Sequence, residues 1–288
     1  MRSSMIRSLI VLLAVAGTGV ALRAGLPTAV PSVTVAADGR VAILNPLTGL
    51  LTIASGTTVE TVWRAPFDFR ASRVTAAGST LLAFCVSKER AEPALWRVRS
   101  AKASAERLTL PDDVRKQIVT GAAASPDGRS LYFVTARRTL LRLGLDQGLQ
   151  LVADRPILLD GTPGVVAAGN AGLVVVADAE SPFVSVVGPK GPSRRISIDQ
   201  PIVTSMSVAP DSRFVLIVTP AFRGVLRLDL ASGRVSRMGA LKFAPGAVAA
   251  APDGSMWVVD AGASQLARLD ASGNVLNVQP LPRGPTRS

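Results

Sequence analysis

The sequence repeats itself at intervals of 42 residues. Turns of the type Pro-Asp-Gly or Pro-Asp-Ser begin at Pro126, Pro210 and Pro252, so their spacings are 84 and 42 residues. A degenerate copy is expected midway through the longer gap, and Ala168-Gly169-Asn170 lies there, followed by the apolar run LVVVAD. Self-similarity at a fixed period of about 20–50 residues is typical of repeat architectures such as solenoids and propellers.

Each period contains four short runs whose composition changes in a fixed order. The first run is made of small residues, as in TGAAAS, GVVAAG, SMSVA and GAVAAA. The second run is bulkier (LYFVT, LVVVAD, FVLIVT, MWVVD), the third includes VLRLDL and LARLD, and the fourth is weaker. Short β-rich runs separated by Gly, Pro, Asp and Ser indicate strands and hairpins. Four strands in every 40–45 residues or so are typical of propeller blades.

This order matches the radial order of strands in a propeller blade. The first strand lines the central channel, where space is least, and the next two pack against neighbouring blades. We therefore predict an all-β fold, a six-bladed β-propeller over residues 32–288, with seven blades as the alternative. The stretch 32–65 is the least regular blade, and its segment Asn45-Pro46-Leu47-Thr48-Gly49 resembles a later third-to-fourth-strand turn, Asp229-Leu230-Ala231-Ser232-Gly233.

A different kind of segment precedes the repeats. Arg2 and Arg7 lie before an apolar run over residues 9–22, and Gly19 and Ala21 form a small-x-small pair suited to signal peptidase. The run is shorter than the roughly 18 residues of a membrane span. We therefore predict a signal peptide over residues 1–21, a linker over 22–31, and export to the periplasm or the extracellular space. An uncleaved anchor, which would be the only membrane contact, is the alternative.

Residue counts exclude several kinds of chemistry. Histidine is absent, which removes Ser-His-Asp triads, Cys-His nucleophiles, histidine metal sites and histidine general bases. The only cysteine, Cys85, cannot form an intramolecular disulfide, and the apolar run LLAFCV predicts that it is buried. The formal net charge of +12 falls to +10 without Arg2 and Arg7, but the basic residues are scattered and only 4% of residues are aromatic. We expect neither a nucleic-acid partner nor a cofactor.

The phrases SPDGRSLYFVT and APDGSMWVVDAG resemble blades of the NHL, YVTN and gluconolactonase (regucalcin) group of β-propellers. The resemblance runs from about residue 32 to the end of the chain and is strongest over residues 119–277. It implies the propeller fold, but such blades serve lactonases, lyases and binding modules alike. It also implies that the usual site is the end of the channel formed by the links between blades and the loops after the second strands, here called the top.

The carboxylates divide between the two ends of the blades. We expect the aspartates in first-strand turns and third-to-fourth-strand turns, at the bottom, to hold those turns, since Asp accepts bonds from the backbone two residues on; they are Asp38, Asp127, Asp146, Asp211, Asp229, Asp253 and Asp270. The candidate ligand-binding residues at the top are Asp178, Glu180, Asp260, Arg137, Arg138, Arg223, Asp160 and Lys242. We predict no metal; if one binds, Asp178 and Asp260 are its ligands, although the resemblance implies that both brace loops.

The resemblance includes two enzyme families whose metal-binding or catalytic residues this sequence lacks. Gluconolactonases hold a divalent metal on the axis with a glutamate, asparagines and an aspartate, whereas the asparagines here map to bottom turns or the last strand; they are Asn45, Asn170, Asn274 and Asn277. We expect the first strands to contribute only Ala, Gly, Ser, Thr and Met206 to the channel. Propellers of the streptogramin lyase type rely on a catalytic histidine, which this chain lacks.

The predicted function is therefore an exported binding or scaffolding module for an unidentified protein, glycan or small ligand. The alternative is a gluconolactonase-like hydrolase with a degenerate metal site. Carboxylates converging at the channel mouth would favour the enzyme, and an apolar or arginine-lined mouth would favour the module.

Overall fold

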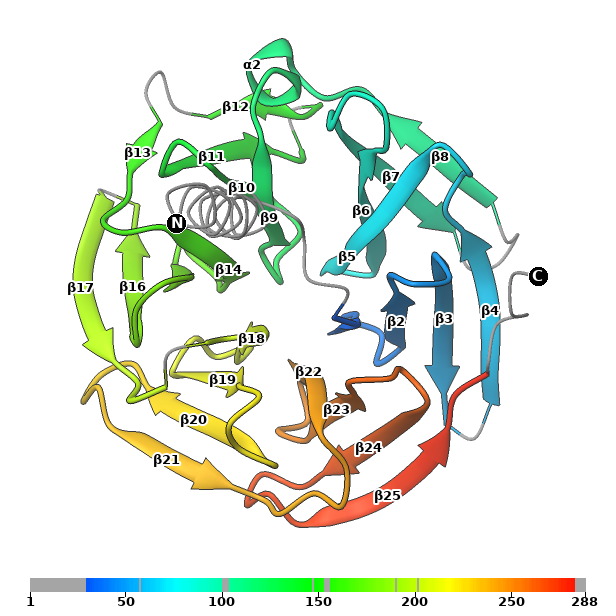
Figure 1. Cartoon of the computed structure of the whole chain (residues 1–288), viewed down its shortest axis with the longest axis vertical. Coiled ribbons are helices and arrows are strands. Elements are labelled where there is room, and N and C mark those ends of the chain that lie inside the picture. The colour runs from blue at the N-terminus through cyan, green and yellow to red at the C-terminus, as the bar shows by residue number, and fades with distance from the viewer. Residues whose placement is uncertain are drawn as a thin grey trace, which may run out of the picture.

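The computed structural model describes residues 30–56, 58–99, 104–146, 148–152, 156–189, 191–200 and 202–282. The described residues form six antiparallel sheets arranged around a central axis, with the first strand of each sheet innermost and the last at the rim (Figure 1). The prediction of a six-bladed propeller is confirmed, and the alternative of seven blades is wrong.

The bounds of the strands follow the repeat. Blade 1 contains β1 (Ser32–Val35), β2 (Val41–Asn45), β3 (Leu50–Ser55) and β4 (Thr58–Arg64). Blade 2 contains β5 (Phe69–Ala77), β6 (Thr80–Ser87), β7 (Pro93–Arg99) and β8 (Ser104–Leu108). Blade 3 contains β9 (Val119–Ala124), β10 (Ser130–Thr135), β11 (Thr139–Gly144), β12 (Gln150–Leu151) and β13 (Ile157–Leu158), and the short helix α2 (Asp112–Arg115) precedes it.

The second half of the ring is more regular. Blade 4 contains β14 (Pro163–Ala168), β15 (Val174–Asp178), β16 (Phe183–Gly188) and β17 (Gly191–Ser197). Blade 5 contains β18 (Ser205–Val208), β19 (Phe214–Val218), β20 (Val225–Asp229) and β21 (Val235–Met238). Blade 6 contains β22 (Pro245–Ala250), β23 (Met256–Asp260), β24 (Gln265–Leu269) and β25 (Val275–Pro280).

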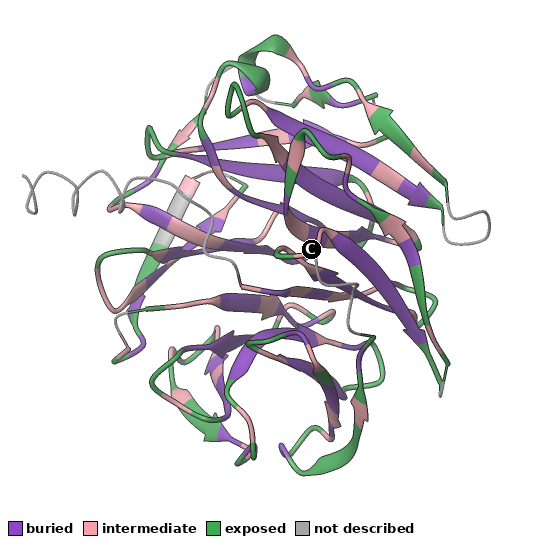
Figure 2. Ribbon diagram, turned by 45° about the vertical axis from the view of Figure 1, so that its right-hand side comes forward, coloured by how far each residue is buried: buried purple, intermediate pink, exposed green. Residues whose placement is uncertain are grey.

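The core lies between the blades. The described residues form six buried apolar clusters, and each cluster joins one pair of neighbouring blades, including blade 6 with blade 1. Buried positions concentrate in the inner strands, while exposed positions gather in turns and at the rim (Figure 2). Cys85 on β6 is fully buried, as predicted, and burial raises the pKa of its thiol because the thiolate would lose its hydration.

Blade 3 departs from the pattern at the rim. The run LQLVAD, which stands at the place of the fourth strand of the repeat, contains β12, and both β12 and β13 pair with β11. A second departure corrects the prediction for Asn45, which ends β2 and therefore lies at the top rather than in a bottom turn. The resemblance of its turn to a third-to-fourth-strand turn is local: Asn45 Oδ1 accepts bonds from the Leu47 and Thr48 amides, a contact that suits a turn at either end.

The predicted signal peptide and most of the predicted linker lie outside the described residues. Among the residues that are described, no helix has the length and apolar character needed to cross a membrane.

Candidate functional site

Hydroxyl side chains connect the innermost strands of neighbouring blades. Ser32 and Thr34 on β1 accept hydrogen bonds from the amides of Val74 and Ala76 on β5, each at 3.2 Å. Thr75 on β5 in turn accepts a bond of 2.9 Å from the Ala124 amide on β9. The inner edge of a blade presents unpaired backbone groups, so these hydroxyls satisfy amides that face the channel.

The same device joins blades 5 and 6. Ser205 Oγ accepts a hydrogen bond of 3.2 Å from the Val248 amide, and Ser207 Oγ accepts one of 3.0 Å from the Ala250 amide. Ser205 and Ser207 hold the register positions that Ser32 and Thr34 hold in blade 1, three residues and one residue before the end of the first strand. The serines and threonines of the small-residue runs therefore act as bridges between blades.

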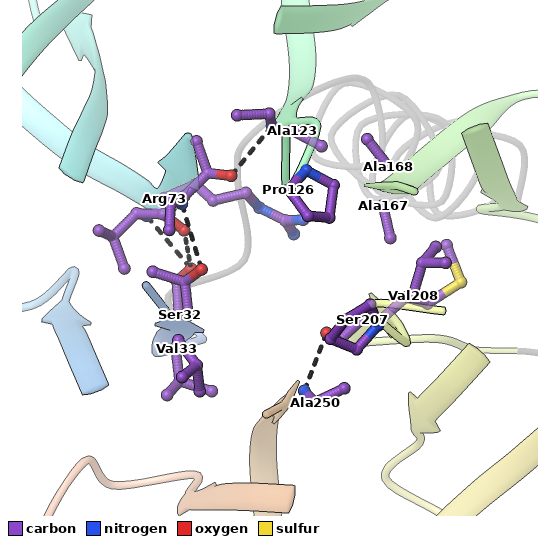
Figure 3. Close-up of a pocket in the computed structure, with 18 of the residues that line it drawn as sticks. Ser32, Val33, Arg73, Ala123, Pro126, Ala167, Ala168, Ser207, Val208 and Ala250 are labelled. Carbon is purple, nitrogen blue, oxygen red and sulfur yellow. Dashed lines mark hydrogen bonds between the residues drawn. The ribbon is translucent and has the colours of Figure 1, made fainter. Parts of the chain in front are cut away.

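Arg73 holds in blade 2 the position that Ser32 and Ser205 hold in blades 1 and 5. Each of the three lies two residues before a hydroxyl that accepts a bond from an amide of the next blade; these hydroxyls belong to Thr75, Thr34 and Ser207. Its side chain extends from β5 into the channel (Figure 3), and its Nη1 donates a hydrogen bond of 3.0 Å to the carbonyl oxygen of Val166 on β14, two blades away. No ion pair of Arg73 exists within the described parts of the chain. Burial lowers the pKa of Arg73 to about 10, because the charged form loses hydration, so the guanidinium is still charged at neutral pH.

A cavity of about 360 Å³ fills the channel between Arg73 and the bottom turns. Its lining is mainly small or apolar residues of the first strands, including Val33, Ala167 and Val208 (Figure 3). Of the described residues that line it, two are charged, Arg73 and Asp127. The arrangement can hold a small molecule in a chamber with both polar and apolar surface, between the positive charge of Arg73 and the carboxylate of Asp127.

Asp127 lies at the bottom end of this cavity and is occupied by its own turn. Its Oδ1 accepts a hydrogen bond of 2.5 Å from Ser125 Oγ and one of 3.0 Å from the Arg129 amide. Burial raises the pKa of Asp127, but these hydrogen bonds outweigh it and hold the pKa below its usual value. Asp127 is therefore an ionised carboxylate at neutral pH.

The eight predicted site residues lie at the top, as the blade order predicts, and none of them lines this cavity. Asp178 is opposite Pro163 and Asp260 is opposite Pro245, at the starts of β14 and β22, whereas the cavity reaches to the turns at the ends of the first strands. The remaining six are exposed: Arg137, Arg138, Asp160, Glu180, Arg223 and Lys242. Ligand binding by this set stays a prediction.

Asp178 and Asp260 brace the loops that follow them. Asp260 accepts bonds from the Ser264 and Gln265 amides, both at 2.6 Å, and from Ser264 Oγ at 2.9 Å. Asp178 accepts a bond of 2.9 Å from the Glu180 amide and pairs with Arg195 at 3.4 Å. Both carboxylates thus have protein partners, and within the described ranges no three carboxylate or cysteine side chains gather as a metal site would require.

Six of the seven bottom aspartates hold turns as predicted, and for Asp146 the role stays a prediction. Oδ1 atoms of aspartates in the first-strand turns accept bonds from the amide two residues on, at Asp38, Asp127, Asp211 and Asp253. Two aspartates between third and fourth strands do the same for nearby amides, Asp229 for Ser232 and Asp270 for Ser272.

The sequence analysis missed Arg73, because it expected only Ala, Gly, Ser, Thr and Met206 from the first strands. That expectation is wrong at this position. A signal was present in the run SRVTAAG, where arginine precedes the small residues that mark the channel wall. Its meaning depends on the register, which places Arg73 where other blades carry a serine.

No family model matches the sequence, and no curated protein sequence matches it. Solved structures do resemble it. Virginiamycin B lyase from Staphylococcus aureus is 16% identical with a TM-score of 0.58, over 89% of this chain and 86% of that chain. A catalytically inactive histidine-to-alanine variant of that lyase with quinupristin is 16% identical with a TM-score of 0.55, over 90% and 86% of the two chains.

A protein of different function is equally similar. Hydrazine synthase from Kuenenia stuttgartiensis is 15% identical with a TM-score of 0.60, over 91% of this chain and 89% of that chain. At such identities the likeness shows the propeller fold shared with these lyases and related proteins. It does not select one function among them.

Proposed function

We propose that this protein is an exported binding module that takes a small ligand in the axial cavity between Arg73 and the bottom turns. The observation that carries this proposal is the cavity itself: about 360 Å³ of space, open in part to solvent, with walls that include alanine, valine, serine and threonine residues. This volume falls in the range of small-molecule sites, about 300–1,000 Å³. The walls offer orientation and packing rather than a nucleophile with its base.

The proposal is tested by closing the cavity from its bottom end. Ala37 is an exposed turn residue on the cavity rim and holds the place of Pro126, Pro210 and Pro252 in other blades, so Ala37→Trp adds bulk at the opening without disturbing the core. The probes are benzoate and benzamide at millimolar concentration, followed by saturation-transfer NMR. We expect at least one probe to bind the wild type and to lose binding in Ala37→Trp; failure of both probes to bind would overturn the proposal.

The competing reading is a metal-dependent hydrolase. We expect little thermal stabilisation by calcium or zinc, whereas a ligand at 100 times its Kd adds about 2.7 kcal/mol to the free energy of unfolding. A clear rise in Tm with millimolar calcium, removed by Asp178→Ala or Asp260→Ala, would restore the hydrolase. A lyase of the virginiamycin type is disfavoured, because the histidine-to-alanine variant of that enzyme is catalytically inactive and this sequence has no histidine.

Export is the second part of the proposal and rests on the sequence of residues 1–21, a basic start followed by an apolar run and a small-x-small pair. Intact-mass measurement of the protein expressed with its full sequence tests it. We expect a mature chain that begins at residue 22 in the periplasmic or extracellular fraction. Recovery of the whole chain in the membrane fraction would support an anchor instead.

A further inference from the structure

We propose that the axial cavity selects small organic monocarboxylates with an apolar body, and that Arg73 binds their carboxylate. The inference rests on the proposed function and deepens it, because it names the ligand class of the same cavity. Its starting point is a charged side chain inside the ring for which the described residues provide no counter-ion.

A buried arginine is ordinarily paired, since taking its charge out of water is unfavourable unless an opposite charge or several hydrogen bonds compensate. Arg73 has five N–H donors, and the bond that the structure shows is the one from Nη1 to the Val166 carbonyl. The only cause of the lowered pKa of Arg73 is lost hydration, without an opposing carboxylate. The guanidinium therefore lacks the anion that buried arginines usually have.

Bridging between blades does not require an arginine at this position. Ser32 and Ser205, at the matching positions of blades 1 and 5, bond the amides of the next blade with a neutral hydroxyl. In blade 2 the charged side chain instead enters the cavity (Figure 3). A fork of donors at the wall of this cavity suits a ligand with a planar anionic group, because guanidinium and carboxylate form two parallel hydrogen bonds.

The rest of the cavity indicates what the carboxylate is attached to. Val35, Pro126, Pro210 and Ala250 are partly exposed residues of the lining and give the cavity apolar surface. Such walls stabilise a hydrocarbon or aromatic body by burying it, at about 25 cal/mol per Å² of apolar surface. A small, fully hydrated anion such as phosphate gains nothing from them, since it would lose water without apolar contacts in return.

The opposite end of the cavity limits the charge of the ligand. Asp127 is ionised at neutral pH and lines the bottom of the chamber. A second negative charge at the far end of the ligand would lie near this exposed carboxylate, and like charges repel. The chamber therefore accepts a monoanion and disfavours a dianion.

The test compares benzoate with benzamide, which has the same shape and no charge, by isothermal titration with the full mature chain. We expect benzoate to bind at least 10-fold more tightly than benzamide, and phosphate to compete poorly with benzoate. Arg73→Met should remove the preference and should also raise the Tm of the ligand-free protein, because it removes a partly buried charge that has no counter-ion among the described residues. Arg73→Lys keeps the charge without the planar fork and should keep part of the preference. It provides a second variant if Arg73→Met does not fold.

Arg227→Met is the matched control. Arg227 lies on β20, stacks over Phe214 and does not line the cavity, so this variant removes one positive charge elsewhere. It should leave the ratio of the two dissociation constants unchanged. Equal binding of both probes by the wild type, or a benzoate preference that survives in Arg73→Met, would overturn the inference. If Ala37→Trp still blocked the probes, the proposed function would stand. A lower Tm with an unchanged preference would instead make Arg73 a brace between blades 2 and 4.

Discussion

The junction between blades 1 and 2 and the junction between blades 6 and 1 both bury apolar side chains, but polar contacts support them unequally. Between blades 1 and 2, Ser32 and Thr34 bond the amides of β5, and the Ala37 amide donates a bond of 2.9 Å to the Gly78 carbonyl. An apolar cluster that includes Leu44 lies behind these bridges.

Between blades 6 and 1 the corresponding positions are Ala247 and Ala249, which have no hydroxyl to offer. The two blades meet through a cluster that contains Val33 and Ile43 from blade 1 and Leu266 from blade 6. Each of these blades is also built from one continuous stretch, residues 32–64 and 245–280, so no strand is exchanged between the ends of the chain.

The comparison indicates that, in the described part of the chain, the junction where the two ends of the ring meet is held by side-chain packing without the hydroxyl bridges of the junction between blades 1 and 2. Loop closure is unfavourable in conformational entropy, and it must be offset by contacts that form only when the ring is complete. The apolar cluster between blades 6 and 1, here called the closing junction, provides them. We therefore expect the closing junction to open before the junction between blades 1 and 2, here called the bridged junction.

The largest effect is expected from removing the closing blade. Deleting residues 245–288 exposes the apolar faces of blades 5 and 1 and leaves both without a neighbour. We expect aggregation, or a broad thermal transition measured by circular dichroism in place of a cooperative one. A truncated chain that stays soluble and melts as sharply as the full chain would show that the closing junction contributes nothing to cooperativity.

Two neighbouring residues of β2 test the two junctions separately. Ile43 faces the closing cluster and Leu44 faces the cluster between blades 1 and 2, and both are buried. Ile43→Ala and Leu44→Ala should each lower the free energy of unfolding by about 2–5 kcal/mol, measured by urea denaturation. Ile43→Ala should additionally speed amide hydrogen exchange in β22 but not in β18. Uniform exchange changes would mean that the ring opens at no preferred junction.

The fold could be predicted from the sequence because each blade carries its own local sequence signals. Turns such as Pro252-Asp253-Gly254 and the change from small to bulky runs depend on backbone conformation and on the space available at each radius, and both recur every 42 residues. The strands of blade 1 were harder to assign, because the side-chain hydrogen bonds that hold the turn after Asn45 can form at either end of a blade. Only the pairing of β1 with β2 decides its place.

The axial cavity could not be predicted in the same way. Its walls come from all six blades, and the importance of Arg73 depends on an alignment with Ser32 and Ser205 across the ring. In the sequence Arg73 is one of 32 basic residues. Aspartates that end second strands, such as Asp178 and Asp260, stood out more clearly there, yet the structure shows them bonded to their own loops.

A smaller effect is expected from removing one hydroxyl bridge at the bridged junction, or from adding one at the closing junction. Thr34→Val keeps the shape of the side chain but leaves the Ala76 amide without its acceptor, so we expect a loss of about 1 kcal/mol in the free energy of unfolding. Ala249→Ser places a hydroxyl at the matching position of blade 6, beside the Val35 amide, and should stabilise the closing junction by up to about 1 kcal/mol. If Ala249→Ser instead destabilised the ring as strongly as Thr34→Val, the two junctions would not be equivalent in register, and the comparison would fail.

The smallest effect concerns a charged contact that only the bridged junction has. Asp38 pairs with Arg40 at 2.6 Å, and Arg40 Nη2 donates a bond of 2.9 Å to the Ser79 carbonyl of blade 2. The hydrogen bond from Arg40 lowers the pKa of Asp38 below its ordinary value of 3.8. A carboxyl with a depressed folded-state pKa stabilises the protein above its unfolded pKa, and that stabilisation is lost as the pH falls through the folded value.

Asp38→Asn should therefore lower the free energy of unfolding by only about 0.5 kcal/mol at pH 7, because the pair is partly exposed and screened by solvent. The difference between the variant and the wild type should vanish below the folded pKa, in urea titrations carried out between about pH 5 and pH 2. Asp253→Asn is the control: Asp253 pairs at 2.6 Å with Arg268 of its own blade, so its loss should leave amide exchange at the blade 1–2 junction unchanged. Faster exchange in β5 for Asp38→Asn, and not for Asp253→Asn, would place the Arg40 contact among the bridges that separate the two junctions. Equal effects of the two variants on amide exchange would mean that Asp38 and Arg40 form an ordinary surface ion pair with no role at the junction.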